Sequence, residues 1–163
     1  MTPTWTIVFF LATLPFCVLC AAFDLTRMKI PNWVVLALFA CFLLLGPFAL
    51  PWPELGWRLL QTAVVLVVGF LLTSYFGVGG GDGKFAAAAA AFVAPGDYGV
   101  IMIALAVLSL MAVWLHRTMG RMPALKPLTG DWESYRDPGK FPFGLPLATT
   151  LVFYNMVQIL HAF

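Results

Sequence analysis

Long apolar runs alternate with short polar segments along the whole chain. A helix needs about 20 apolar residues to cross roughly 30 Å of hydrocarbon. Five runs approach that length, at 5–23, 33–50, 59–78, 98–115 and 143–160. A sixth run, 84–94, is short, and at ~1.5 Å per residue it covers only about half of the hydrocarbon thickness. The pattern predicts an all-α integral membrane protein, a bundle of about six transmembrane helices.

The composition agrees with this prediction. Of the 163 residues, 62% are hydrophobic and 10% are charged, whereas a soluble domain carries roughly a quarter of charged residues. The surplus apolar surface is expected to face lipid, in a single transmembrane domain that covers residues 1–163. No Lys or Arg precedes the first apolar run, so we interpret it as a spanning helix and not as a cleavable signal peptide.

The basic residues indicate how the bundle is oriented. The segments 24–32, 79–84 and 116–142 hold eight of the nine Lys and Arg residues, and only Arg58 lies on the other side of the alternating spans. The positive-inside rule therefore places these three segments in the cytoplasm and both termini outside. Segment 116–142 is the only long polar stretch. It is either a solvated connector or a platform for a cytoplasmic part of a substrate.

Several kinds of chemistry are not indicated. Cys17, Cys20 and Cys41 all lie inside apolar runs, and the Cys17–Cys20 spacing has no second pair and no histidine nearby. We interpret them as small buried hydrophobic residues and expect no metal site and no cofactor. Basic residues are not interleaved with aromatic residues in the manner of nucleic-acid-binding proteins. We therefore expect no nucleic-acid partner.

Two aspartates stand out against the apolar background. Asp24 ends the first apolar run, and Asp82 lies in a glycine-rich segment after the third run. Ionisable groups at membrane depth are costly and are candidate functional residues for that reason. The orientation derived above brings both acids to one membrane face. Two carboxyls that meet there could share one proton and activate a water molecule.

The glycine-rich segment 79–84 does not fit the known phosphate-binding patterns. In G-x-x-x-x-G-K-[ST] the first glycine would fall on Val78, and Phe85 stands in place of Ser or Thr. No complete G-x-G-x-x-G is present, and no strand is expected before the segment. Nucleotide binding is therefore not predicted.

Each aspartate also has a purely structural interpretation. Asp82 could cap the helix that follows it, with the glycines ending the preceding helix. Asp24 could be a helix-end acid paired with Arg27, three residues further on. The six alanines from Ala86 to Ala91 likewise have two interpretations, close helix packing in lipid or a groove for a substrate helix.

Three motifs resemble those of the type IV prepilin peptidases, membrane aspartyl proteases of the GxGD class. Asp24 with Ile30-Pro31-Asn32 resembles the first-aspartate motif of that family. The second-aspartate motif is matched by Gly79-Gly80-Gly81-Asp82-Gly83-Lys84. The entry to the last span is matched by Lys140-Phe141-Pro142-Phe143-Gly144, although Leu145 stands where the family often has proline. The matches follow the family's order and its six-helix plan.

This resemblance implies an aspartic endopeptidase with Asp24 and Asp82 as its catalytic residues. Its substrate would be a prepilin, cut just before a hydrophobic N-terminal helix at the cytoplasmic face of the bacterial inner membrane, with both termini of the enzyme periplasmic. The short length is similar to members that serve Flp/Tad-type pili. Longer relatives carry an additional region with paired CxxC motifs and also methylate the product, so we expect cleavage without methylation here.

Two other functions remain open at this stage. A proton-coupled carrier or channel could use the two acids as a relay, which would require polar residues along several spans. The polar residues that stand out within the spans are few, Gln61 with Thr62 in one span and Asn155 with Gln158 in another. No internal repeat indicates a transporter built from inverted halves. A structural subunit of a secretion machine, with capped helices, is the other alternative. The identity of the pilin, contacts with membrane lipid and the oligomeric state are left open.

Overall fold

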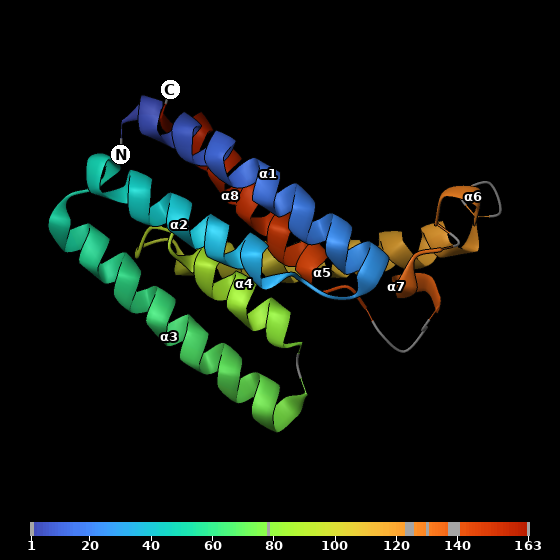
Figure 1. The fold of residues 1–163 in the computed structure, drawn as a ribbon. Coiled ribbons are helices and arrows are strands. Elements are labelled where there is room, and N and C mark those ends of the chain that lie inside the picture. Colours follow the sequence, from blue (N-terminus) through green and yellow to red (C-terminus); the bar gives the residue numbers. More distant parts are fainter. Residues whose placement is uncertain (1, 78, 123–125, 130, 137–140, 163) are drawn as a thin grey trace.

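The fold was obtained as a computed structural model, which describes residues 2–77, 79–122, 126–129, 131–136 and 141–162. The helices in chain order are α1 (Pro3–Arg27), α2 (Asn32–Ala49), α3 (Trp52–Phe76), α4 (Gly80–Ala90), α5 (Tyr98–Arg121), α6 (Lys126–Thr129), α7 (Glu133–Arg136) and α8 (Gly144–Ala162). Figure 1 shows α1 beside α8, α3 beside α4, and both termini at one end of the bundle. The short helices α6 and α7 lie at the other end.

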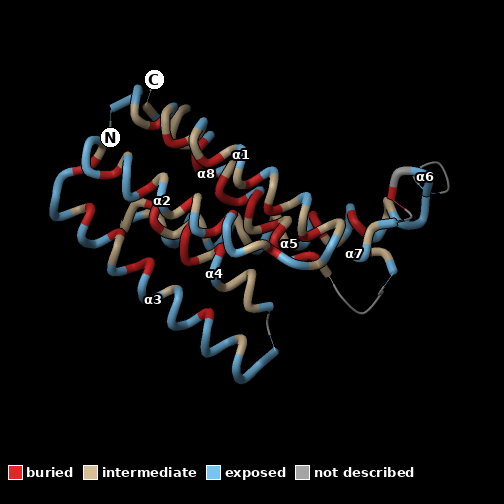
Figure 2. The backbone as a smooth tube through the Cα atoms, in the orientation of Figure 1, coloured by how far each residue is buried: buried red, intermediate tan, exposed pale blue. Residues whose placement is uncertain are grey.

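The predicted all-helical membrane bundle is confirmed. Among the described residues, five helices are long and apolar enough to cross a membrane, namely α1, α2, α3, α5 and α8. Their outer faces carry large exposed apolar side chains, such as Phe70 on α3 and Leu110 on α5. Figure 2 shows the buried positions gathered where the helices meet. The exposed faces are those that lipid would cover.

Proline and glycine set several helix ends. Pro31 precedes the first residue of α2 with φ −63°, and Gly77 ends α3 in the left-handed region at φ 70°. Helix α3 begins at Trp52, earlier than the expected residue 59. Pro53 lies in its first turn. The backbone N–H that proline lacks would have no partner inside the helix at this position.

Helix α4 differs from the expectation in its position along the chain. It begins at Gly80, and its N-cap residue is Gly79, so Asp82 and Lys84 belong to the start of the helix and not to a preceding loop. It ends at Ala90, and its 11 residues would cover ~16 Å at the usual rise. Helix α4 is therefore the short member of the bundle and does not span a membrane by itself.

The expected loop 116–142 is only partly irregular. Helix α5 continues to Arg121, and α6 and α7 lie within the same stretch. The imidazole of His116 stacks on the ring of Tyr135 from α7, with ring centroids 4.2 Å apart. This stacking attaches α7 to the end of α5, which is why the stretch does not form an open connector throughout. Residues 123–125, 130 and 137–140 of this stretch lie outside the described part.

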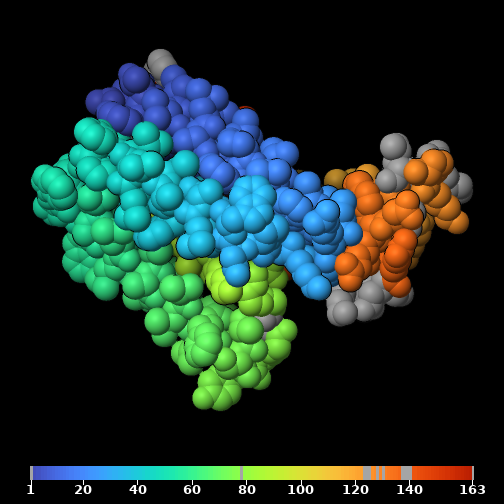
Figure 3. Space-filling view, viewed as in Figure 1, coloured from blue at the N-terminus to red at the C-terminus, as the bar shows by residue number. Residues whose placement is uncertain are grey.

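The core contains an aromatic cluster and a line of small residues. Phe92 makes edge-on contacts with Phe9 of α1 and Phe42 of α2, at ring-centroid distances of 5.3 and 5.4 Å. Ala87 and Ala88 of α4 are buried, and Figure 3 shows α4 reaching the surface between α2 and α3. The alanine run thus lets α4 approach its neighbours closely, as one of its two interpretations requires.

Candidate active site

Asp24 lies in the last turn of α1 and its side chain is turned into the protein. The residue is buried, with 5% of its surface exposed. Its Oδ2 accepts a hydrogen bond of 2.6 Å from the backbone N–H of Gly144, the first residue of α8. Helix N-termini carry free N–H groups and the positive end of the helix dipole. The start of α8 therefore supports a negative charge on Asp24.

Asp82 lies in the first turn of α4, outside the five long apolar helices, and is half-buried. Burial, and after it the neighbouring Asp24 carboxyl, raise the pKa of Asp82 to about 7. The influence of Asp24 means that the two carboxyls lie close enough for their charges to interact. Two acids in such a relationship ionise as a pair and hold one proton over part of the pH range.

Ile30 packs between the starts of α4 and α8 and joins the three motif segments. A Cβ atom built on Gly81 would lie 3.2 Å from Cβ of Ile30, and one built on Gly144 would lie 2.9 Å from its Cδ1. The same atom on Gly144 would lie 2.9 Å from Oδ2 of Asp24. Glycine at positions 81 and 144 thus leaves the space that Ile30 and the Asp24 carboxyl occupy.

A second link joins the first two motifs at the surface. Nζ of Lys84 donates a hydrogen bond of 3.1 Å to Oδ1 of Asn32, at the first residue of α2. Lys84 follows Asp82 by two residues in one helix, so the two side chains leave α4 in different directions. Lys84 therefore ties the start of α4 to the start of α2.

The remaining predicted site residues lie around this region. Gly79 is the N-cap residue of α4, and a Cβ there would lie 2.6 Å from Oδ2 of Asp82. Gly83 packs against Gly69 of α3, where a Cβ on Gly69 would lie 2.9 Å from Cα of Gly83. Pro142 is fully buried before α8. Lys140 lies outside the described residues.

Neither structural interpretation of the aspartates describes what is found. The N-cap residue of α4 is Gly79, and it makes no side-chain cap hydrogen bond. Asp82 instead occupies the first turn itself. Asp24 forms no ion pair with Arg27 in the described part of the chain, and the Arg27 guanidinium lies over the Phe23 ring at 5.3 Å.

Two residues at this site were not predicted from the sequence. Gly69 provides the close contact with Gly83, and a glycine in the middle of the apolar run 59–78 was its only signal. Cys20 is fully buried one turn before Asp24, with its Sγ 3.8 Å from the carbonyl oxygen of Gly144. It fills the space behind the Asp24 carboxyl. Among the described residues, no group of three or more His, Cys, Asp or Glu could hold a metal ion.

The geometry defines a helical membrane protein with two interacting carboxyls at one end of the bundle. The profile of the type IV leader peptidase family matches residues 11–116, which is more than half of the chain and includes both aspartates. The chain belongs to this family. No curated protein and no solved structure matches it. Gly144 lies beyond the matched range, and its place in the site comes from the fold alone.

Proposed function

We propose that this peptidase is an aspartic endopeptidase that removes the leader peptide of a prepilin-type substrate, with Asp24 and Asp82 as its catalytic pair. The observation that carries the proposal is the meeting of the three motif segments, where Ile30 packs against Gly81 of α4 and Gly144 of α8, and Gly144 donates to Asp24 of α1. The family match supports a leader peptidase. The short chain favours the Flp/Tad type of substrate.

The chemistry follows from a pair that holds one proton. The ionised carboxyl takes a proton from water, which then attacks the scissile carbonyl carbon. The protonated carboxyl gives its proton to the carbonyl oxygen as the tetrahedral intermediate forms. On collapse, the carboxyl that took the proton from water gives it to the leaving amine, and the other carboxyl takes a proton back from a hydroxyl of the intermediate, which leaves an acid and an amine. The pair acts as a unit, and neither role is assigned to one residue. The N–H of Gly144 holds Asp24 in one orientation throughout.

An apolar groove along α4 supports a substrate with a hydrophobic helix. The groove has a volume of about 530 Å³ and lies between α2, α3 and α4. Its lining includes Phe39, Ala63 and Ala87, and Asn32 and Lys84 close one end of it. A hydrophobic segment lying in this groove would reach Lys84 at the start of α4, the part of the helix that also carries Asp82. In this proposal the alanine run also forms part of a groove for a substrate helix.

The cellular location belongs to the same proposal. The carboxyl pair lies at the end of the bundle that carries α6 and α7, away from both termini (Figure 1). With the basic segments in the cytoplasm, cleavage would occur at the cytoplasmic face of the bacterial inner membrane and both termini would be periplasmic.

The experiment that tests the proposal is co-expression with candidate prepilins in a host that lacks its own prepilin peptidase. Leader removal is read by gel mobility and by the mass of the new N-terminus. We expect a product that begins at the edge of the hydrophobic segment. Unprocessed prepilins alongside correctly inserted protein would contradict the proposal.

A further inference from the structure

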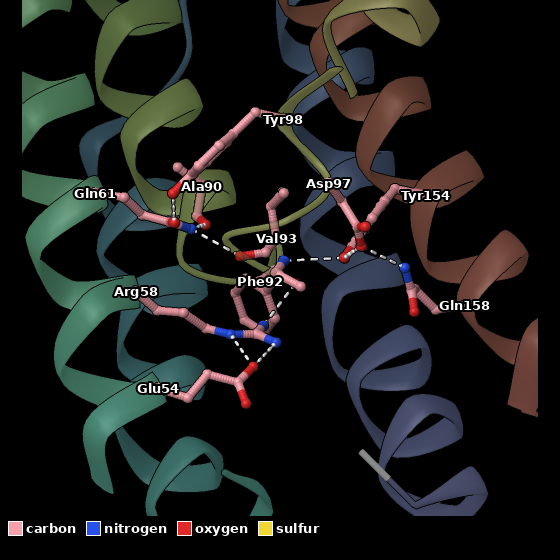
Figure 4. Close-up of polar contacts among 11 residues, drawn as sticks. Glu54, Arg58, Gln61, Ala90, Phe92, Val93, Asp97, Tyr98, Tyr154 and Gln158 are labelled. Carbon is pink, nitrogen blue, oxygen red and sulfur yellow. Dashed lines mark hydrogen bonds and ion pairs between the residues drawn. The ribbon is translucent and has the colours of Figure 1, made fainter. Parts of the chain in front are cut away.

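A second group of polar side chains lies at the end of α4 that is remote from Asp82 (Figure 4). Arg58 and Gln61 reach it from α3, and Tyr154 and Gln158 reach it from α8. Arg58, Gln61 and Tyr154 are each more than nine-tenths buried. A carrier could use such residues as a relay, but Arg58, Gln61 and Tyr154 each make hydrogen bonds to the backbone of residues 90–94.

The contacts from α3 satisfy the carbonyl groups where α4 ends. Nη1 of Arg58 donates to the carbonyl oxygen of Phe92 at 3.0 Å. Nε2 of Gln61 donates to the carbonyl oxygens of Ala90 and of Val93, the latter at 2.8 Å. The last carbonyls of a helix have no partner inside it, and leaving them bare away from water is costly. These two side chains therefore fix the end of α4 to α3.

The contacts from α8 hold the segment that follows. The hydroxyl of Tyr154 accepts a hydrogen bond of 2.9 Å from the N–H of Ala94 and donates one of 2.7 Å to Oδ2 of Asp97. Nε2 of Gln158 donates to the same oxygen at 2.8 Å. Residues 94 and 97 are thus tied to α8 by two side chains that lie one turn apart.

The two helices that hold this end of α4 also bound the catalytic end. Gly69 of α3 packs against Gly83, one residue after Asp82, and Gly144 of α8 donates to Asp24. Between the two ends α4 carries Phe85 and the alanines 86–90, so few large side chains there resist sliding along α3. The hydrogen bonds at its end are directional and do resist it.

We propose that Gln61 and Tyr154 are positioning residues that fix α4 along its axis and thereby hold Asp82 opposite Asp24. Helix α4 has only 11 residues, so a shift at one end passes to the other. Misplacing a reacting group by ~1 Å can lower a rate by about a hundredfold. The inference rests on the proposed function, since it concerns the same carboxyl pair.

The test compares Gln61→Met and Tyr154→Phe with the unaltered protein, purified in detergent and assayed on a leader peptide joined to its hydrophobic segment. Both variants remove hydrogen bonds and nearly preserve side-chain size. We expect kcat to fall by about tenfold or more for each, with KM within about twofold because neither residue contacts the groove. Tyr75→Phe, at an exposed position of α3, is the matched control and should leave kcat unchanged.

The Thr13→Val variant distinguishes a general loss of stability from a loss of positioning. This change removes the buried hydrogen bond from Asn155 to Thr13, which joins α8 to α1. It should lower the melting temperature and leave kcat near that of the unaltered protein. If Tyr154→Phe keeps the full kcat, or if Thr13→Val lowers kcat as much as Tyr154→Phe does, the proposal that Gln61 and Tyr154 position α4 is wrong.

A measurement without substrate tests the positioning of α4 even where a variant or the unaltered protein does not cleave. Amide hydrogen exchange of residues 80–94 should quicken in Tyr154→Phe, and in Gln61→Met where it folds, and should stay unchanged in Tyr75→Phe and Thr13→Val. Unchanged exchange in Tyr154→Phe overturns the inference independently of activity. An inactive unaltered protein with the expected exchange pattern counts against the proposed function alone.

Discussion

The backbone N–H of Gly144 donates a hydrogen bond of 2.6 Å to Oδ2 of Asp24, across 120 positions of the sequence. The bond joins the last turn of α1 to the first turn of α8. A Cβ atom at position 144 would lie 2.9 Å from that same oxygen, which is closer than side-chain atoms pack. The orientation of the Asp24 carboxyl therefore depends on a glycine that lies far from it in sequence.

Replacing this glycine should disturb the carboxyl and leave the bundle intact. In Gly144→Ala the new methyl group would press on both Asp24 and Ile30, so we expect leader processing to fall by about ten- to a hundredfold. Processing is measured in cells alongside the amount of inserted protein. Gly56→Ala is the control, because a Cβ there meets nothing within 4 Å. That variant should process normally and gain ~0.5–1 kcal/mol of helix stability.

Filling the apolar groove should weaken substrate binding more than catalysis. Ala63 lines the groove and is exposed, so Ala63→Phe adds a ring without displacing a buried contact. We expect KM to rise several-fold and kcat to change little, since the lost contacts bind substrate and transition state alike. Ala106→Phe, at an exposed position of α5, should leave both constants unchanged. Equal effects of the two changes would argue against the groove as the substrate's place.

The rate of cleavage should fall on the alkaline side of neutrality. Burial and the nearby Asp24 carboxyl raise the pKa of Asp82 to about 7, so the pair keeps its shared proton below that pH. As the pH rises through about 7 the proton leaves, both carboxyls are ionised, and no acid remains. Initial rates measured from about pH 6 to about pH 9 give the test. A flat profile across this range would rule out a shared proton.

Much of the fold could be predicted from the sequence, because a spanning helix needs a long apolar run and the runs are plain. The short helix near 84–94 was also indicated, but its start was placed four residues too late. Gly80, Gly81 and Gly83 favour a loop by their own propensity. The contacts of Gly83 with Gly69 and of Gly81 with Ile30 override that preference and draw them into α4.

Only part of the candidate site could be predicted from the sequence. Asp24 and Asp82 were found because charge is rare in these runs, and the family motifs pointed to Ile30 and Gly144. The sequence did not indicate that Ile30 fills the space between two helix starts, since that contact exists only in the fold. Likewise Gln61 appeared as an isolated polar residue. Its Nε2 donates to two backbone carbonyls and its Oε1 accepts from the Tyr98 hydroxyl, contacts that no sequence pattern displays.

The orientation in the membrane can be tested by labelling. Asp131 is fully exposed, so Asp131→Cys should stay unreacted with a membrane-impermeant maleimide in intact cells and react after permeabilisation. Thr2→Cys, near the exposed N-terminus, should react in intact cells. Cys17 and Cys20 are buried and Cys41 is half-buried, so the background is low. The reverse pattern would place the carboxyl pair on the periplasmic side and contradict the charge argument.

The most direct measurement of the central claim is prepilin cleavage by Asp24→Asn, Asp82→Asn and the double variant. Asparagine keeps the size and can still accept a hydrogen bond from Gly144, but it neither takes up nor donates a proton as a carboxyl does. Each variant should insert at normal levels and lose cleavage, and the double variant should lose nothing further. Asp131→Asn, the same change at an exposed site, should cleave normally. Near-normal cleavage by either single variant would contradict the catalytic pair.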